Sequence, residues 1–500
     1  MPSAKPQPSF YWHDYETSGI DPRRDRPVQF AGQRTTLDLE PIGAPLSVYC
    51  APAADILPQP GACLITGISP QHALREGVVE AEFAARVHEE LAQPGTCAVG
   101  YNSIRFDDEF TRNLLYRNFH DPYEREWKSG NTRWDIIDLA RLCYALRPDG
   151  IEWPRGASAV ALSRDNPEGH TSASPFIPSF KLVDLAAANG LAHTHAHNAL
   201  SDVEATIAFA RLLRSQQPRL WNFYFDLRRK QRALELLDYT HRTPVLHVSS
   251  RYPAQRGCLA MIVPLAQHPS QPNKIIVYDL DADPQPLLDL DAADIADRLF
   301  TPRRDLPDDV VRIPLKAVAI NKSPALAPLS VLKGTDAARI GLDQDRCMNH
   351  LRQLHEAPDL IEKLRRVFAS QSDFEEALDP ELAIYRGFAS DADKRLFQKV
   401  RSALPQELGA LANAFHDARY PELLFRYRAR NFPQTLNAEE SSRWDEFRQT
   451  RLTQPTTLTS VTADAYFAEI TMARADASLS GEQRVLLDQL ESWGRQLVAS

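Results

Sequence analysis

Hydrophobic and polar positions divide the chain into three regions of different character. Residues 1–205 mix short apolar runs with segments whose apolar residues recur at helical spacing, so an α/β region is predicted. Residues 240–330 hold short β-branched runs separated by Pro, Asn and Asp, which is typical of a small barrel or sandwich. From Asp336 onward the strand pattern fades, and long amphipathic segments such as 350–368 predict an all-helical region.

Within the α/β region, Gly and Pro residues mark where the expected elements stop. A helix is expected to begin near Ser201, because Ser201 and Glu204 have the spacing of a capping box. Residues 155–178 carry Ser, Pro, Gly, Asn and Asp and predict a loop. The other elements predicted here are strands at 10–12, 45–50 and 97–101 and helices at 107–119, 134–146 and 181–189.

Composition narrows the class of protein. With 500 residues and 43% hydrophobic content, the chain can bury a large core, and its length suggests two to four domains. A net charge of −9 counts against a protein that coats nucleic acid non-specifically, although it allows a locally basic groove. Six scattered cysteines without a C-x-x-C pair argue against a zinc ribbon or a disulfide framework. Without a signal region or a run of about twenty apolar residues, a soluble cytoplasmic protein with no membrane contact is expected.

Two acidic residues follow the first predicted strand. Asp14 and Glu16 are two positions apart, so on a strand both side chains project from one face. Adjacent carboxylates repel each other, and a hard divalent cation such as Mg²⁺ or Mn²⁺ relieves that repulsion. A D-x-E pair alone is more often a turn with exposed acids, so the pair needs support from elsewhere in the chain.

A third acid opens the next predicted helix, in the motif Asn102-x-x-x-Phe106-Asp107. A carboxylate at that helix start can complete a metal site or orient the attacking water. Asp108 and Glu109 are adjacent alternatives, and any of the three can instead complement the helix dipole. Only the spacing from Asn102 favours Asp107.

The last candidate motif is His197-x-x-x-x-Asp202. Histidine titrates near neutral pH, so His197 can accept a proton from the attacking water, while Asp202 can supply another metal ligand. His193 and His195 are assigned no role, since a lone histidine is more often structural than a ligand. Taken in order along the chain, four carboxylates and one histidine are the groups that two-metal phosphodiester hydrolysis requires.

At these residues the sequence resembles the DEDD exonuclease superfamily, histidine subtype, and over nearly its whole length it resembles the bacterial exonuclease I family. The catalytic motifs occur throughout the superfamily, whereas the last stretch below and the three-part architecture are more specific. The stretches that carry the resemblance are His13-Asp14-Tyr15-Glu16-Thr17, Arg105-Phe106-Asp107-Asp108-Glu109, Tyr116-Arg117-Asn118-Phe119, Tyr144-Ala145-Leu146-Arg147-Pro148 and Tyr427-Arg428-Ala429-Arg430-Asn431-Phe432-Pro433.

The resemblance implies an RNase H-like α/β exonuclease domain at residues 1–215, an SH3-like β-barrel domain at 216–352 and an all-helical C-terminal domain at 353–500. It implies 3′→5′ hydrolysis of single-stranded DNA to 5′-mononucleotides, in DNA repair and recombination. The implied partners are single-stranded DNA and the single-stranded DNA-binding protein, and a monomer is expected.

The resemblance also implies roles for individual residues. Asp14, Glu16 and Asp202 would bind two Mg²⁺ ions, for which Mn²⁺ would substitute. Asp107 would complete the catalytic carboxylates, and His197 would be the general base.

Two stretches, 211–232 and 425–432, mix positive charge with aromatic rings, which suits phosphates and stacked bases. The alternative is a solvated basic helix face with its aromatic residues in the core.

Lys181 stands where the family has arginine, so bidentate phosphate bonding is lost, and the loop at 155–178 is longer than the family's. The resemblance implies that Glu16 and Lys181 touch the substrate, and it places beside the incoming strand the region that contains Arg112, Tyr123, Trp127, Arg141 and Arg147. Lys230, in the first basic stretch, is a further expected contact with DNA.

Three other functions remain open at this point. An RNA-trimming or proofreading exonuclease of the same superfamily is usually one short catalytic domain, unlike this chain. A non-catalytic single-strand-binding protein has no use for acids clustered beside phosphates. A glycosidase that uses paired acids is the most distant alternative.

Overall fold

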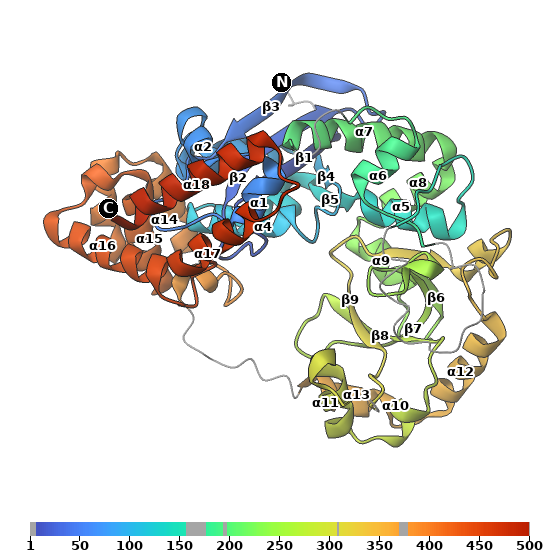
Figure 1. The fold of residues 1–500 in the computed structure, drawn as a ribbon. Helices are drawn as coiled ribbons and strands as arrows, with labels where there is room; N and C mark the ends of the chain where they lie inside the picture. Colours follow the sequence, from blue (N-terminus) through green and yellow to red (C-terminus); the bar gives the residue numbers. More distant parts are fainter. Residues whose placement is uncertain (1–6, 157–176, 194–197, 308–309, 370–378, 500) are drawn as a thin grey trace, which may run out of the picture. The chain divides into compact units, whose positions relative to one another are not determined.

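The computed structural model describes residues 7–156, 177–193, 198–307, 310–369 and 379–499 (Figure 1). The chain forms two compact units, each built from separate segments. The first contains Met1–Thr132, His193–Ile207 and Glu375–Ser500, and the second contains Arg133–Ala192 and Ala208–Phe374. Most of the predicted loop at 155–178, together with His195 and His197, lies outside the described residues. Among the described residues, no helix has the length and apolar character needed to cross a membrane.

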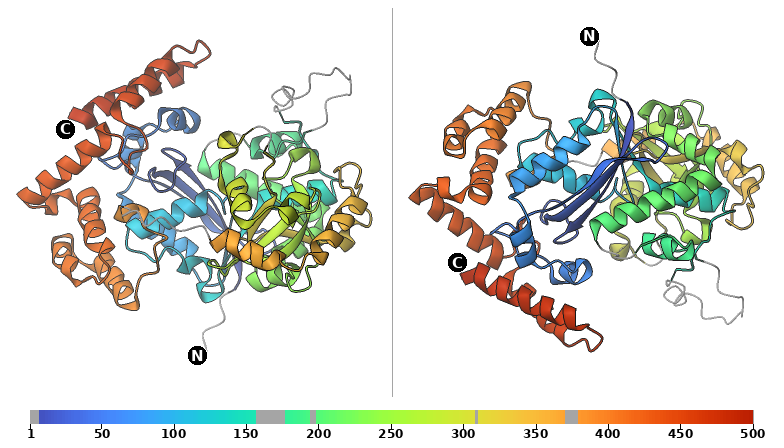
Figure 2. Two further views of the ribbon diagram at one scale, coloured as in Figure 1. Left: turned by 90° about the horizontal axis from the view of Figure 1, so that it is seen from below. Right: turned by 90° about the horizontal axis from the view of Figure 1, so that it is seen from above.

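A five-stranded mixed sheet with the order β3-β2-β1-β4-β5 organises the first unit. Its three long strands are β1 (Ser9–Thr17), β2 (Pro27–Thr35) and β3 (Pro41–Tyr49), which form the dark blue ribbon in Figure 2. β1 pairs antiparallel with β2 and parallel with β4 (Thr96–Gly100), and β5 (Thr132–Asp135) leads into the second unit. The strands predicted at 10–12, 45–50 and 97–101 are confirmed.

One face of this sheet is buried under α3 (Glu80–Leu91). Tyr11 and Tyr15 of β1 pack there with Phe30 and with Phe83 of the helix, and the Tyr15 and Phe30 ring centroids are 4.8 Å apart. Because strand side chains alternate between faces, Asp14 must project from the opposite face of β1. Burial of the tyrosines therefore sets the direction in which the acids point.

The C-terminal helices belong to the first unit and pack on its early segments. α17 and α18 lie against α1 (Figure 1), in a core where Cys63 meets Tyr466, Leu487 and Leu490. All six cysteines are buried and none is in a disulfide, as expected. Besides α3, the helices described in this unit are α1 (Pro60–Thr66), α2 (Pro70–Glu76), α4 (Asp107–Arg117), the start of α7 (Ala199–Gln216), α14 (Asp391–Ser402), α15 (Arg419–Asn431), α16 (Ala438–Thr453), α17 (Ala463–Arg474) and α18 (Gly481–Ala499).

A buried ion-pair network joins these helices to the sheet. Glu381 has a fully buried side chain and accepts from Arg430 at 2.6 Å and from Arg26 at 3.0 Å. Asp55, also fully buried, pairs with Arg430 at 2.8 Å and with Arg451 at 2.7 Å. Burial alone would raise the pKa of Glu381, but the surrounding arginines, Arg430 foremost, hold it well below the usual range. The network therefore links segments far apart in the sequence through charges that stabilise only as a set.

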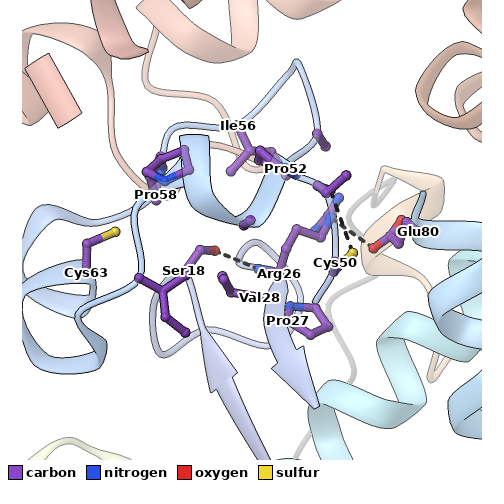
Figure 3. A pocket seen from close by; sticks show the side chains of 15 residues that line it. Ser18, Arg26, Pro27, Val28, Cys50, Pro52, Ile56, Pro58, Cys63 and Glu80 are labelled. Carbon is purple, nitrogen blue, oxygen red and sulfur yellow. Dashed lines mark hydrogen bonds and ion pairs between the residues drawn. The ribbon is translucent and has the colours of Figure 1, made fainter. Parts of the chain in front are cut away.

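Arg26 also lines a small cavity of about 40 Å³ in the first unit (Figure 3). Its other walls are mainly apolar, among them Val28, Cys50 and Ile56. The charged groups at its edge are Arg26 and Glu80, which pair at 3.5 Å. Because opposite charges compensate each other there, this cavity lacks the uncompensated acids of a divalent metal site.

The second unit contains an antiparallel sheet with the order β10-β6-β7-β8-β9. Its strands, β6 (Val245–Val248), β7 (Leu259–Gln267), β8 (Lys274–Asp279), β9 (Leu315–Ala319) and β10 (Ala325–Pro328), fall in the region predicted to be a barrel or sandwich. Besides the later part of α7, the helices described in this unit are α5 (Ile136–Leu146), α6 (Leu182–Ala188), α8 (Pro218–Asp226), α9 (Lys230–Leu236), α10 (Gln285–Asp289), α11 (Ala292–Phe300), α12 (Gln344–Glu356) and α13 (Leu360–Ala369).

The amphipathic segment at 350–368 is interrupted. It contains the end of α12 and most of α13, which are separated around Pro358, a residue that cannot donate a helical hydrogen bond. The domain limits expected at 215/216 and 352/353 fall within α7 and α12.

Replacing Glu381 with Gln should destabilise the first unit, because several buried arginines then lose a counter-charge. We expect the free energy of unfolding, measured in denaturant, to fall by about 3–5 kcal/mol at pH 7. Since the folded pKa of Glu381 is lowered, its stabilisation is present above the unfolded pKa of about 4.3 and is lost as the pH falls further. The difference between variant and wild type should therefore shrink in acid.

Asp445→Asn is the matched control, since Asp445 is 62% exposed and lies 3.8 Å from Arg448. Its effect should stay below about 1 kcal/mol. Equal stability of Glu381→Gln and wild type at pH 7 would contradict the role given to the network.

Candidate metal centre

Three acidic side chains converge beside β1. One carboxylate oxygen from each of Asp14, Glu16 and Asp202 lies within 4.8 Å of the others. The parallel pairing of β1 with β4 reaches Trp12 and Val99, so the two acids of β1 lie just beyond the paired segment. Carboxyl ends of parallel strands are common ligand sites in open α/β sheets. The sheet thus supplies two of the acids, and the start of α7 supplies the third.

Burial and mutual repulsion both act on this cluster. Burial, with Asp107, Glu16 and Asp202 as further causes, raises the pKa of Asp14 well above its usual value. Burial and then the charge of Asp202 raise the pKa of Glu16 to about 8. A divalent cation would remove this repulsion, and oxygen donors suit hard ions such as Mg²⁺ and Mn²⁺. The residues present therefore fit a divalent metal site.

Asp107 is the acid of α4 that approaches Asp14. Its Oδ1 accepts a hydrogen bond from the backbone N–H of Tyr15 at 3.2 Å, between the two acids of β1. Asp108 and Glu109 instead form ion pairs with arginines, at 2.7 Å and 2.9 Å. Among these three adjacent acids, Asp107 is the one that bonds the backbone of β1 beside Asp14.

The turn between β4 and α4 explains that spacing. Asn102 has a φ of 64°, a left-handed conformation that Asn adopts more readily than most residues. Two positions earlier, Gly100 lies close to β1, and a Cβ at this position would lie only 2.8 Å from the carbonyl oxygen of His13. A glycine and then an asparagine therefore let the chain leave the sheet close to β1 and begin α4 beside the acids.

Asp202 lies in the first turn of α7, but the predicted cap of that helix is wrong. The Asn198 side chain accepts from the N–H groups of Leu200 at 3.2 Å and Ser201 at 3.4 Å, and the helix begins at Ala199. Ser201 is thus already helical and cannot be the cap. The shift leaves Asp202 near the helix start, as the motif required.

His193 contacts Asp202, and nothing in the sequence indicates this contact. Its Nε2 lies in hydrogen-bonding contact with Oδ1 of Asp202, and its side chain is largely buried. The alternating histidines at 193, 195 and 197 offer no local signal for which of them meets the acid. The predicted base, His197, lies outside the described residues.

The predicted DNA contacts in the first unit have different surroundings. Trp127 is 64% exposed and available to a ligand. Arg112 is buried, and its guanidinium bonds both oxygens of Glu126, at 2.7 and 2.8 Å, and Glu109 at 2.9 Å. These acids already compensate its charge, so in this structure Arg112 positions neighbouring groups more than it offers charge to a phosphate.

Tyr123 contacts two aromatic residues, Tyr385 and Phe388, that the sequence did not identify as DNA contacts. Its ring centroid lies 5.4 Å from that of Phe388 and 6.4 Å from that of Tyr385. Phe388 is 80% exposed and Tyr385 is 56% exposed. The segment Tyr385-Arg386-Gly387-Phe388 lacks a periodic pattern, so only the tertiary contact with Tyr123 identifies it.

The remaining predicted contacts lie in the second unit. Arg141 pairs with Asp138 at 2.8 Å, and Arg147 donates to Thr335 Oγ1 at 2.7 Å. Lys181 and Lys230 are exposed.

The positive charges predicted to meet DNA at 425–432 are buried instead. Arg426 pairs with Asp379 at 2.7 Å, Arg428 pairs with Glu440 at 2.6 Å, and Arg430 belongs to the ion-pair network. Internal carboxylates compensate these arginines, so they form neither an exposed charged surface for phosphates nor the solvated basic face that was the alternative.

Removing one acid should stabilise the metal-free protein. The pKa of Glu16 is about 8 when folded and about 4.3 when unfolded, so folding becomes less favourable as the pH rises between these values. Glu16→Gln removes this penalty and should raise the midpoint of thermal unfolding at pH 8 in a chelator. It should also remove most of the stabilisation that Mn²⁺ gives the wild type.

Glu82→Gln is the control, because Glu82 is half exposed and pairs with Arg86 on the surface of α3. It should leave both midpoints unchanged. A lower midpoint for metal-free Glu16→Gln than for the wild type would argue against repulsion within the cluster.

Comparison with known proteins assigns a family to each part of the chain. Residues 11–210 match the family described as "Exonuclease", 228–370 the "Exonuclease I SH3-like domain" and 378–497 the "Exonuclease I C-terminal domain". These descriptions agree with the predicted fold class: an α/β exonuclease domain, an SH3-like domain and a helical C-terminal domain.

Individual relatives match over most of the chain. Exodeoxyribonuclease I of Escherichia coli is 45% identical over 90% of this chain and 91% of its own length. The solved structure of Exonuclease I from Methylocaldum szegediense has 50% identity and a TM-score of 0.91, covering 98% of this chain and 100% of that one. The zinc-bound complex of E. coli ExoI with single-stranded DNA has 42% identity and a TM-score of 0.89, with the same coverage. The chain belongs to the exonuclease I family.

Proposed function

We propose that this chain hydrolyses single-stranded DNA from its 3′ end and releases 5′-mononucleotides. The convergence of Asp14, Glu16 and Asp202 beside β1, with Asp107 adjacent, carries the proposal. Family membership supports it, since the relatives include a solved complex of the E. coli enzyme with zinc and single-stranded DNA. We also propose a role in DNA repair and recombination.

The clustered acids and His197 have different roles in this hydrolysis. Asp14, Glu16 and Asp202 would hold two Mg²⁺ ions, and Mn²⁺ would substitute. When bound, such ions activate the water nucleophile and stabilise the charge that develops at the phosphate. Asp107 completes the acidic set, while its bond to the Tyr15 N–H anchors α4 to β1. His197 removes the proton of the attacking water.

Exposed rings in the first unit would hold the strand. Phe388 and Tyr385 form a platform with Tyr123, and Trp127 adds another exposed ring. Base stacking on an aromatic ring contributes about 1–3 kcal/mol and does not depend on sequence. Glu16 would also touch the terminal nucleotide, and the second unit would add Arg141, Arg147, Lys181 and Lys230.

Several finer proposals accompany this function. We propose the domain limits 1–215, 216–352 and 353–500, Mg²⁺ as the natural metal, a cytoplasmic location and a monomer. Contact with the single-stranded DNA-binding protein is proposed from the family resemblance.

Nucleotide release from end-labelled oligonucleotides tests the activity. Purified protein with Mg²⁺ should release mononucleotides from the 3′ end of single-stranded DNA, and much less from duplex DNA or RNA. Chelation or Asp14→Ala should reduce release by at least about 10³-fold, because a ligand of the metal cluster is lost. Faster release from RNA would favour an RNA-trimming enzyme, and tight binding without release would favour a non-catalytic binding protein.

His197→Ala should lower turnover by about 10²–10⁴-fold, the usual contribution of a general base. That loss should persist at saturating Mg²⁺, since the histidine acts on the water. His193→Ala is the matched control, because His193 contacts the Asp202 carboxylate. The loss of turnover in His193→Ala should diminish as the Mg²⁺ concentration is raised. Near-normal turnover of His197→Ala with a large, metal-insensitive loss in His193→Ala would move the role of base to His193.

A further inference from the structure

We infer that Gln29 is a positioning residue that sets the distance between the start of α7, which carries Asp202, and the sheet, which carries Asp14 and Glu16. The inference rests on the proposed function, because it concerns the assembly of the same acidic cluster. Gln29 belongs to none of the predicted motifs and is not itself one of the clustered acids.

The position of Gln29 in the sheet places it beside the cluster. It lies on β2 directly opposite Glu16 in the antiparallel pairing. Directly opposed residues of an antiparallel pair project from the same face, so the Gln29 side chain lies on the face of the acids. It is 1% exposed, and a polar side chain buried to that extent normally has hydrogen-bond partners.

The two ends of the Gln29 amide bond different elements. Its Oε1 accepts from the backbone N–H of Ala199, the first residue of α7, at 3.4 Å. Its Nε2 donates to Ser47 Oγ of β3 at 3.2 Å. One side chain thus spans from the edge strand of the sheet to the helix that delivers the third acid.

The bond to Ala199 complements the helix cap. The first N–H groups of a helix lack partners within it. Asn198 caps the N–H groups of Leu200 and Ser201, and Gln29 accepts a hydrogen bond from the preceding N–H group, that of Ala199. Asp202 follows three positions after Ala199, less than one helical turn away. Asn198 is next to α7 in the chain, whereas Gln29 lies on β2, so the bond from Ala199 to Gln29 ties the helix start laterally to the sheet.

A neutral amide suits this position. A carboxylate at residue 29 would accept the same bond from Ala199 but would add a negative charge opposite Glu16 and lose the donor to Ser47. An apolar side chain of similar size would fill the space but leave the Ala199 N–H without its acceptor. Gln29 therefore holds the helix without adding to the repulsion among the acids.

Metal affinity measured without DNA tests the inference. Mn²⁺ binding to the full chain should weaken about 10-fold in Gln29→Leu, because loss of outer contacts to a metal site typically costs 10–100-fold in affinity. Turnover on single-stranded DNA at saturating Mn²⁺ should return to within about two-fold of the wild type, since the acids themselves are intact. Unchanged Mn²⁺ affinity in a folded Gln29→Leu protein would overturn the inference.

Ser47→Ala is the matched control, because it removes the other bond of the same amide and leaves the helix contact in place. Its Mn²⁺ affinity should stay within about two-fold of the wild type. A loss as large as that of Gln29→Leu would overturn the inference by placing the effect in the sheet.

Hydrogen exchange provides a readout that does not depend on activity. The peptide containing Ala199 should exchange faster in Gln29→Leu than in the wild type, and Gln29→Glu, which keeps an acceptor, should preserve slow exchange. If Gln29→Leu fails to fold, Gln29→Asn serves instead, because its amide is too short to reach both partners. Equal exchange in variant and wild type would overturn the inference. A wild-type protein that binds no Mn²⁺ would refute the proposed function itself, a distinct result.

Discussion

Repulsion among acids brought together from distant parts of the chain is the constraint on which the first unit depends. Asp14 and Glu16 lie on one strand, Asp107 opens a helix about ninety positions later, and Asp202 lies in the first turn of another helix. Burial and neighbouring charge raise the pKa values of the first two, so without a cation the folded state carries an energetic cost there. The rest of the unit must supply enough stabilisation to keep these groups in place.

The buried ion-pair network provides part of that stabilisation. Asp55 and Glu381 are surrounded by arginines from α15, from α16 and from the position just before β2, so the C-terminal helices are attached to the sheet by charges that have lost their water. Breaking such a set costs far more than forming an exposed pair gains. The acidic cluster and this network thus differ in their electrostatics. The like charges of the cluster need a cation to offset their repulsion, whereas the unlike charges of the network compensate each other.

The network also changes how the charge of the chain should be interpreted. Many arginines are paired inside the protein, among them Arg26, Arg426 and Arg430, so a count of basic residues does not measure affinity for phosphate. The net charge of −9 is equally uninformative about the site, because it sums buried and exposed groups alike. Exposed rings such as Phe388 and Trp127 are better indicators of a surface that stacks bases.

The sequence by itself determined what depends on neighbours along the chain. Strand alternation placed Asp14 and Glu16 on one face, and the asparagine turn placed Asp107 at the start of α4. Only the tertiary structure decided that Asn198 caps α7, that His193 meets Asp202, and that the arginines at 425–432 turn inward. These outcomes depend on which segments pack together, and a local pattern of polar and apolar residues does not specify the partner that a polar side chain finds across the fold.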